Sequence, residues 1–203
     1  MDDVSELHIS TATDGRIVAE ADLRGDADVQ GVIHEARTRG AQVLWAYGGD
    51  LDPQGFVREG GYTRLAAGSI PVEDSEPLGT TSDPDDLVEL LRLGFLGQWG
   101  HKLPDREALA RAAGRADVFY LVAAGNGGVC CVDRDERLID APGVVPEMRS
   151  AESYLSLLRA ACALLGEGPA TIESWGDPPE RLASYGELGF EVVERLDGWT
   201  LEL

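Results

Sequence analysis

Cysteine and histidine are the side chains best suited to nucleophilic, basic or metal-binding chemistry, and this chain of 203 residues has three of each. Cys130 and Cys131 are adjacent in an apolar run that predicts a strand, so their thiols should face opposite sides of a sheet. A nucleophilic cysteine needs a nearby base or cation, and nothing in the sequence brings His8, His34 or His101 beside either thiol. The spacing matches no zinc-binding pattern. We therefore predict packing cysteines and no metal site.

A glycine-rich stretch, Gly-Asn-Gly-Gly at residues 125–128, has the composition of a phosphate-binding loop. A nucleotide-binding loop would continue with Lys and then Ser or Thr, and neither follows here. The Asn-Gly pair is instead typical of a tight turn between two strands. We predict a β-hairpin with strands over residues 118–124 and 129–133.

Acidic residues dominate the charge of the chain, with 37 Asp and Glu against 17 Lys and Arg and a net charge of −20. Such a surface repels phosphate backbones and anionic lipids, so we expect neither a nucleic-acid nor a membrane partner. The first residues have no basic region followed by an apolar run, and no apolar run approaches the ~20 residues of a membrane span. Three cysteines do not form a disulfide framework. These features favour a cytoplasmic protein.

The elements that must position any site follow from hydrophobic periodicity and turn residues. Before residue 71 we predict a hairpin over 7–11 and 16–20, a helix over 26–39, a strand over 41–47, a short helix over 52–59 and a strand over 62–70. After residue 86 we predict helices over 87–97 and 106–113, the hairpin above, a strand over 138–145, a helix over 150–165, and then strand, helix and strand over 171–174, 179–187 and 191–203.

One pattern occurs twice. The segment around Tyr47-Gly48 and Gly61-Tyr62 is similar to the segment around Trp175-Gly176 and Gly189-Phe190, and the offset is constant: 176 − 48 = 128 and 189 − 61 = 128. Each copy reads aromatic-Gly, short helix, Gly-aromatic and apolar strand, which favours a duplication. The Pro-rich acidic stretch between the copies indicates a linker. We predict domains over 1–72 and 87–203, joined by a linker over 73–86.

The second domain resembles the GNAT superfamily of acyl-coenzyme A N-acyltransferases in its order of elements. Residues 139–149 (Ile-Asp-Ala-Pro-Gly-Val-Val-Pro-Glu-Met-Arg) resemble the strand before the coenzyme A helix, and residues 185–190 (Tyr-Gly-Glu-Leu-Gly-Phe) are similar to a closing Tyr-x-x-x-Gly-Phe. Residues 7–70 resemble the C-terminal part of the same fold, in a tandem arrangement similar to the mycothiol synthase type. The resemblance implies an α/β (α+β) fold: a truncated N-terminal half, a complete C-terminal GNAT domain, and mixed central sheets flanked by helices.

The resemblance also implies a cofactor, acetyl-CoA or another acyl-CoA. The family holds the pyrophosphate with a loop of type Arg/Gln-x-x-Gly-x-Gly/Ala at a helix start. Here Arg149, Ser150, Ala151 and Ser153 would hold it, while Gly143, Val144 and Val145 would offer backbone N–H groups to the thioester. Glu152 and Tyr154 stand where the family has glycines, and a carboxylate about 4 Å from a phosphate charge costs roughly 1–4 kcal/mol. The alternative is an ordinary helix start with Ser150 as N-cap.

For catalysis, the resemblance implies Tyr185 as the acid that protonates the departing thiolate. Glu136, Asp140 and Glu173 lie near the relevant strand ends and are the candidates for a general base. Trp99 and His101, in the connection between the first two helices, are the candidates for substrate contact. Each has a plain alternative: a packed tyrosine, solvated carboxylates, and a surface loop anchored by Trp99.

Two functions follow from these residues. The leading hypothesis is an N-acyltransferase that moves an acetyl or acyl group from acyl-CoA to the amine of a small molecule. The alternative is a degenerate GNAT-like protein that does not bind coenzyme A and acts as a binding or scaffold protein, or uses the cleft for a different reaction. The oligomeric state stays open, with a homodimer among the options.

Overall fold

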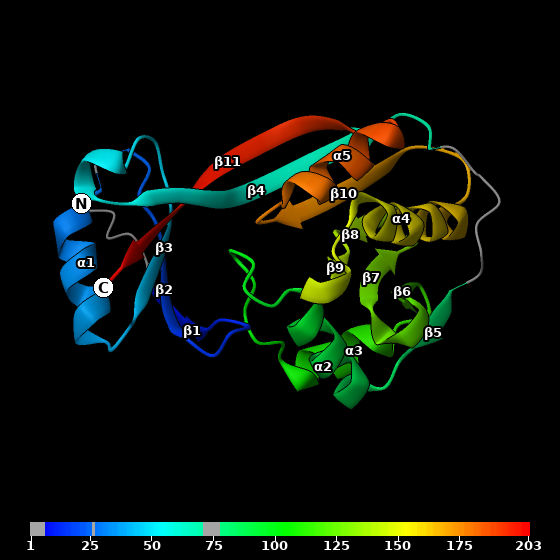
Figure 1. Cartoon of the computed structure of the whole chain (residues 1–203), viewed down its shortest axis with the longest axis horizontal. Coiled ribbons are helices and arrows are strands. Elements are labelled where there is room, and N and C mark those ends of the chain that lie inside the picture. Colours follow the sequence, from blue (N-terminus) through cyan, green and yellow to red (C-terminus); the bar gives the residue numbers. More distant parts are fainter. Residues whose placement is uncertain (1–6, 26, 71–77) are drawn as a thin grey trace.

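The computed structural model describes residues 7–25, 27–70 and 78–203. Within these residues, one mixed sheet follows the strand order β1-β2-β3-β11-β4-β10-β8-β7-β6-β5, and β9 pairs with β7 beside this path (Figure 1). The strands are β1 (His8–Thr11), β2 (Ile17–Asp22), β3 (Val43–Tyr47), β4 (Val57–Ala67), β5 (Gly79–Thr81), β6 (Val118–Val122), β7 (Gly128–Asp133), β8 (Leu138–Asp140), β9 (Gly143–Val144), β10 (Ala170–Trp175) and β11 (Glu191–Glu202).

Five α-helices flank the sheet in the part of the chain just defined. They are α1 (Val29–Thr38), α2 (Pro84–Gly94), α3 (Arg106–Ala113), α4 (Ala151–Leu165) and α5 (Pro179–Glu187). Four of them begin at a capping side chain that accepts a backbone N–H of the first turn, which fixes where each helix starts: Asp28, Asp83, Asp105 and Ser150. None of the helices in these residues combines the length and the apolar character that crossing a membrane requires.

The two faces of the sheet carry separate layers. One core packs α4 and α5 against Cys130, Ile139 and Ile172. A second core packs α2 and α3 against Tyr120, Val129 and Cys131. The prediction that the two adjacent thiols face opposite sides is therefore confirmed, because side chains alternate along a strand.

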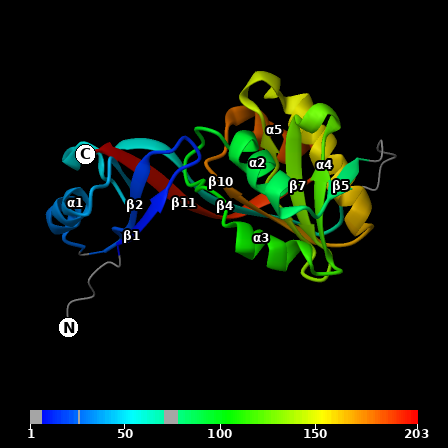
Figure 2. The ribbon, with the colours of Figure 1, turned by 90° about the horizontal axis from the view of Figure 1, so that it is seen from below.

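The two ends of the sheet mirror each other. β11 lies between β3 and β4, and β4 lies between β11 and β10. The order of strands from β1 to β7 therefore reads the same in both directions when β3 is matched with β10 and β4 with β11. Figure 2 shows the long paired β4 and β11 running from the group around α1 to the group around α4 and α5. Strands from residues 1–72 and 87–203 thus alternate in one sheet; β5 and the start of α2 fall inside 73–86, and residues 71–77 lie outside the described residues.

Three predicted elements are wrong in detail. The helix over 52–59 is a 3-10 turn, Asp52–Gln54, because Gly55 takes a left-handed φ of 85° and β4 begins at Val57. The strand over 138–145 is divided into β8 and β9, with Pro142 in the interruption. The hairpin between β6 and β7 closes through a 3-10 turn over Ala124–Asn126 rather than a two-residue turn.

The repeat also needs a different alignment. Gly55 and Gly189 both follow the helix of their half with left-handed φ angles of 85° and 79°. Phe56 and Phe190 come next, are 1% and 4% exposed, and directly precede β4 and β11. The offset at this point is 189 − 55 = 134, not 128, since the N-terminal helix is shorter. Tyr185 therefore corresponds to the buried Leu51.

Candidate functional site

Four chemically active side chains form a row across neighbouring strands. Tyr120 on β6 is paired in register with Cys131 on β7. The pairing of Val132 with Ile139 brings Cys131 beside Asp140 at the end of β8, and Asp140 is paired with Glu173 on the parallel strand β10. Partners in register point to the same face of a sheet. The topology therefore gathers a phenol, a thiol and two carboxyl groups on the face covered by α2 and α3.

A cavity of about 310 Å³ lies over this row. Its polar and aromatic walls are Phe95, His101, Tyr120, Cys131, Asp140, Glu173 and Trp175, and its apolar walls include Leu91, Leu109 and Val129. A concave, mostly apolar space with a few convergent polar groups is the usual form of a small-molecule site. The structure thus brings together three of the sequence-based candidates, Asp140, Glu173 and His101. Glu136 is exposed in the turn before β8, at the other end of that strand, and does not line the cavity.

Asp140 is the carboxyl group in this cavity whose pKa is raised above its ordinary value. As a residue Asp140 is exposed to water, although protein atoms surround its carboxyl group in the cavity. Burial is the main cause that raises the pKa of Asp140, and the negative charges of Glu173 and Asp133 add to it. A hydrogen bond with the Cys131 thiol acts in the opposite direction. Asp140 therefore holds a proton more readily than an ordinary aspartate, as a proton acceptor in a site should.

The two other members of the row are neutral donors. Burial raises the pKa of the Cys131 thiol, and the nearby charge of Asp140 raises it further. Burial likewise raises the pKa of the Tyr120 hydroxyl. Because the thiolate is the nucleophilic form of cysteine, Cys131 is not poised for attack. The sequence-based prediction that neither adjacent cysteine is a nucleophile agrees with this environment.

His101 closes the cavity as a neutral ring. Its Nε2 lies 2.9 Å from the carbonyl oxygen of Trp175, and its ring stacks on Phe95 with centroids 3.9 Å apart. A carbonyl only accepts, so Nε2 carries the hydrogen and donates it. Burial, aided by the positive charges of Arg181 and Arg149, lowers the pKa of His101 to about 3. Lys102, the next residue, is paired with Glu20 outside this cavity.

Trp99 lies outside this cavity and anchors the loop that carries His101. Its side chain is 6% exposed. A Cβ at Gly60 or Gly198 would lie 2.9 or 2.6 Å from its side-chain atoms, and a Cβ at Gly176 would lie 2.4 Å from its carbonyl oxygen. Only glycine leaves room for the indole where β4 and β11 pair through Gly60 and Gly198. The alternative interpretation of a Trp99-anchored loop describes this geometry.

Tyr185 is sealed in the opposite layer. It is 0% exposed, and its hydroxyl lies 3.0 Å from Ser174 Oγ and 3.2 Å from Asp177 Oδ1. Burial is the main cause that raises the pKa of this hydroxyl, Asp177 adds to it, and Arg181 opposes it. Tyr185 therefore belongs to the core packed by α4 and α5 and does not reach the cavity.

Arg181, which the sequence analysis did not single out, joins the two layers. It is 0% exposed although it carries a charge. Its guanidinium donates to Asp177 Oδ1 at 3.1 Å, to the carbonyl of Pro142 at 3.2 Å and to the carbonyl of Trp175 at 2.6 Å. It also lies 6.0 Å from the ring centroid of Phe95 on the cavity side. The i,i+4 spacing of Asp177 and Arg181 is the one sequence signal that could have found it.

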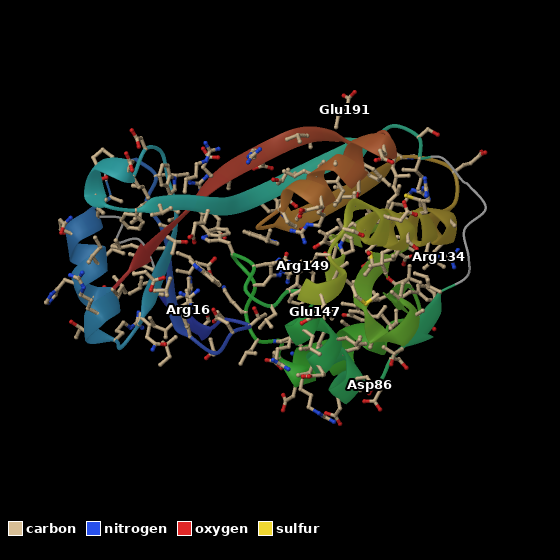
Figure 3. The ribbon with its side chains drawn as sticks, in the orientation of Figure 1. Arg16, Asp86, Arg134, Glu147, Arg149 and Glu191 are labelled. Carbon is tan, nitrogen blue, oxygen red and sulfur yellow. The ribbon has the colours of Figure 1, made fainter. Side chains whose placement is uncertain are left out.

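The start of α4 is closed by internal hydrogen bonds. Ser150 Oγ accepts the N–H of Ser153 at 3.2 Å, and Ser153 Oγ donates to the carbonyl of Met148 at 2.8 Å. Arg149 donates to the carbonyls of Val144 at 3.0 Å and Leu96 at 2.7 Å. Figure 3 shows Arg149 close to β9 near the middle of the molecule, whereas Glu191 projects outward from β11.

Known structures share this architecture. A candidate acetyltransferase from Pyrococcus horikoshii matches with a TM-score of 0.64 and 16% identity, over 98% of this chain and 70% of that chain. A GCN5-related N-acetyltransferase from Sphaerobacter thermophilus matches with a TM-score of 0.57 and 13% identity, over 97% and 76% of the two chains. One from Anabaena variabilis gives 0.56 and 12%, over 97% and 59%. No protein-family model and no curated protein matches the sequence. This chain has the GNAT fold.

The GNAT fold implies coenzyme A, and the residues present do not fit it as the resemblance predicted. The two described bonds of Arg149 hold its guanidinium on backbone carbonyls rather than free for phosphate. Tyr154, where a glycine is expected, is 0% exposed and fills the core beneath the loop. Ser150 and Ser153 cap the helix as in the alternative interpretation. Ala151 accepts at its carbonyl from Ser184 Oγ of α5 at 2.9 Å.

Not all of the backbone donors predicted for the thioester are engaged. Gly143 and Val144 pair with β7, and the N–H of Val145 donates to the carbonyl of Gly127 at 3.0 Å. N–H groups alternate between the two sides of a paired strand, so the N–H of Val144 points away from β7. A Cβ at Gly143 would lie 2.8 Å from the ring of Phe95, so this side of β9 is covered. In the described part of the chain, no group of three or more His, Cys, Asp and Glu side chains is arranged to hold a metal ion.

Proposed function

We propose that this chain, a GNAT-fold protein whose predicted coenzyme A loop does not bind the cofactor, binds a small organic ammonium ion in the cavity beneath α2 and α3. The observation that carries the proposal is the pair of carboxyl groups, Asp140 and Glu173, adjacent in register in one cavity. Two neighbouring carboxylates repel each other unless a proton or a cation joins them. A ligand ammonium would supply that charge.

The walls of the cavity support an amine that also has an apolar part. Trp175 and Tyr120 present aromatic rings, and a cation near such a ring gains about 0.5–2 kcal/mol. Leu91, Leu109 and Val129 offer only apolar contacts. His101 is neutral and adds no competing positive charge. A primary amine on a short hydrophobic or aromatic body suits these surroundings best.

Acyl transfer to the bound amine is the second candidate. The solved structures that share the fold are named as acetyltransferases. One observation in this chain favours it: Asp140, whose pKa is raised by burial, would accept a proton from an ammonium or amine held against Glu173. The reaction needs an activated acyl donor, a thioester or an ester, whose bond to its leaving group breaks as the amine nitrogen bonds to the acyl carbon. Coenzyme A held at the predicted loop is not that donor, because the loop does not fit the cofactor.

The test is a titration of the chain with 2-phenylethylamine, followed by calorimetry and by tryptophan fluorescence, beside 2-phenylethanol as a neutral probe of the same shape. We expect the amine to bind and the alcohol to bind at least ~10-fold more weakly, because the alcohol leaves the carboxylates unpaired. Asp140→Asn should weaken amine binding by about 10- to 100-fold. Glu20→Gln, the matched change in the other half of the sheet, should leave it unaltered. Equal affinity for the alcohol, or an unchanged Asp140→Asn variant, would refute the proposal.

A further inference from the structure

The sheet opens at one place, between β9 and β10. The pairing of β8 with β10 ends at Asp140 and Glu173. One further backbone bond follows, from the N–H of Ala141 to the carbonyl of Glu173. Beyond Pro142, β9 pairs with β7 alone. The carbonyls of Pro142 and Trp175 therefore face each other across a split without backbone partners in it. Buried carbonyls need donors, so something must fill this space.

Arg181 fills it. The side chain starts on α5 on one face of the sheet, and its guanidinium ends 6.0 Å from the ring centroid of Phe95 on the other face. On the way it donates to Pro142 O on one side of the split and Trp175 O on the other. An arginine that is completely buried, with a carbonyl acceptor on each wall, is a structural residue of the fold rather than a surface charge.

The other half of the sheet shows what Arg181 replaces. There β2 and β3 stay paired as far as Asp22 and Tyr47, and the N–H of Leu23 donates to the carbonyl of Tyr47 at 2.7 Å. Tyr47 corresponds to Trp175 by the offset of 128. In the C-terminal half, the carbonyl of Trp175 instead accepts from Arg181 at 2.6 Å and from His101 at 2.9 Å. A side-chain guanidinium thus takes over a hydrogen bond that the backbone makes in the N-terminal half.

We propose that Arg181 closes this split permanently and that the chain consequently binds no coenzyme A thioester between β9 and β10. The split lies beside the amine cavity, but the inference rests on Arg181 and not on the carboxyl pair of Asp140 and Glu173, so either can fail alone. Withdrawal of the guanidinium would leave Asp177, whose side chain is 6% exposed, as an unpaired buried charge. The same Asp177 oxygen also accepts from Ser174, and the Tyr185 hydroxyl lies beside it. A ligand in the split would have to displace the Arg181 guanidinium, and the cost of that displacement would reduce its affinity by at least ~100-fold.

A second barrier lies at the outer end of the same route. Arg149 is held by Val144 O and Leu96 O, so it ties β9 to the loop after α2. Glu152 is exposed in the first turn of α4, where it repels a diphosphate. Tyr154 occupies the core below. Several independent side chains therefore keep coenzyme A out of the split, so the movement of any one of them would not open it.

The decisive experiment adds acetyl-CoA up to about 1 mM to the full chain and measures the melting temperature together with backbone and arginine side-chain NMR signals. We expect no change in melting temperature, no shift at residues 143–153, and an Arg181 Nε–H that exchanges slowly with water. Arg92, whose ion pair with Glu89 is exposed, supplies the fast-exchanging reference in the same spectrum. A ligand at about 100 times its dissociation constant would raise the melting temperature by roughly 5–10 °C. Such a rise with shifts at residues 143–153, or fast exchange at Arg181, would overturn the proposal.

One variant sharpens the test without removing the arginine. Asp177→Asn keeps an oxygen that can accept from Ser174 and Tyr185 but removes the charge that holds Arg181. We expect exchange at Arg181 Nε–H to speed up by at least ~10-fold, since a charged acceptor is worth more than a neutral one. Unchanged exchange would show that Asp177 does not hold the guanidinium. If this variant does not fold, the wild-type measurement alone decides.

Discussion

The two halves of the sheet use the same order of strands to build opposite environments. In the N-terminal half, Glu20 is paired in register with Trp45, and its carboxylate contacts the Tyr47 hydroxyl and Lys102. In the C-terminal half, Asp140 is paired in register with Glu173, and no ion pair of Asp140 is found among the residues that the structure describes. Both acids line cavities, but Glu20 is compensated by Lys102, whereas Asp140 lies beside a second acid.

The difference teaches how a binding site can arise without a new fold. Backbone pairing continues past Glu20 to Asp22 and Tyr47, which leaves no opening. Pro142 lacks an N–H and stands where the C-terminal pairing stops, so the strands separate there. The separated ends then need His101 and Arg181 to complete the hydrogen bonds. The cavity over Asp140 is the space that these side chains leave.

The largest effect should come from breaking the pair that has no counterpart in the N-terminal half. Arg181→Met leaves Asp177 buried and unpaired, and we expect a loss of about 3–5 kcal/mol in the free energy of unfolding. The double change with Asp177→Asn should recover part of that loss, because contacting residues couple by about 0.5–3 kcal/mol. Urea denaturation of the two single variants and the double variant measures the coupling. Strictly additive losses would contradict the pairing.

Trp99→Ala tests the contact that joins the two halves. The indole packs against Gly60 and Gly198, which are paired between β4 and β11, so its removal leaves a cavity beside these two strands. We expect a loss of about 3–5 kcal/mol, as for other buried tryptophans. Trp99→Phe keeps part of the ring and should lose less. Thermal denaturation is the measurement, and a loss below about 1 kcal/mol for Trp99→Ala would mean that the loop is not anchored there.

His101 should make the stability of the fold depend on pH. Its folded pKa of about 3 lies below the ordinary value near 6.5, so the unfolded chain binds a proton that the folded chain rejects. Stability is therefore full above about pH 6.5 and is lost as pH falls; from pH 7 to pH 5 the loss from this group is about 2 kcal/mol. His101→Asn should remove that part of the slope. Denaturation of both proteins at several pH values tests the difference, and parallel curves would contradict it.

Much of the framework could be predicted from sequence, because it rests on local signals. Ser150 before an apolar helical repeat predicted the start of α4, and alternation predicted the opposite faces of Cys130 and Cys131. The site was harder. Asp140 and Glu173 come together through strand pairing between distant segments, and they were selected only as residues near strand ends. Arg181 contacts two backbone carbonyls, which no pattern of residue types records. The repeat was misaligned because Gly-aromatic pairs are common, and only the φ angle and burial at Gly55 and Phe56 distinguish the true one.

The smallest expected effects separate the two acids. Burial raises the folded pKa of Asp140, so ionisation of this group opposes folding, and its contribution to stability is lost as pH rises through that pKa. Asp140→Asn should therefore become more stable than the wild type as pH rises from about 4 to 8, even though its affinity for the amine is lower. Glu20→Gln should shift stability by less than about 1 kcal/mol at any pH, because the Glu20–Lys102 pair is partly exposed. Urea denaturation across this pH range measures both. If the free energies of unfolding of Asp140→Asn and Glu20→Gln respond alike to pH, the two acids have the same environment. The cavity over Asp140 would then have no particular affinity for a cation.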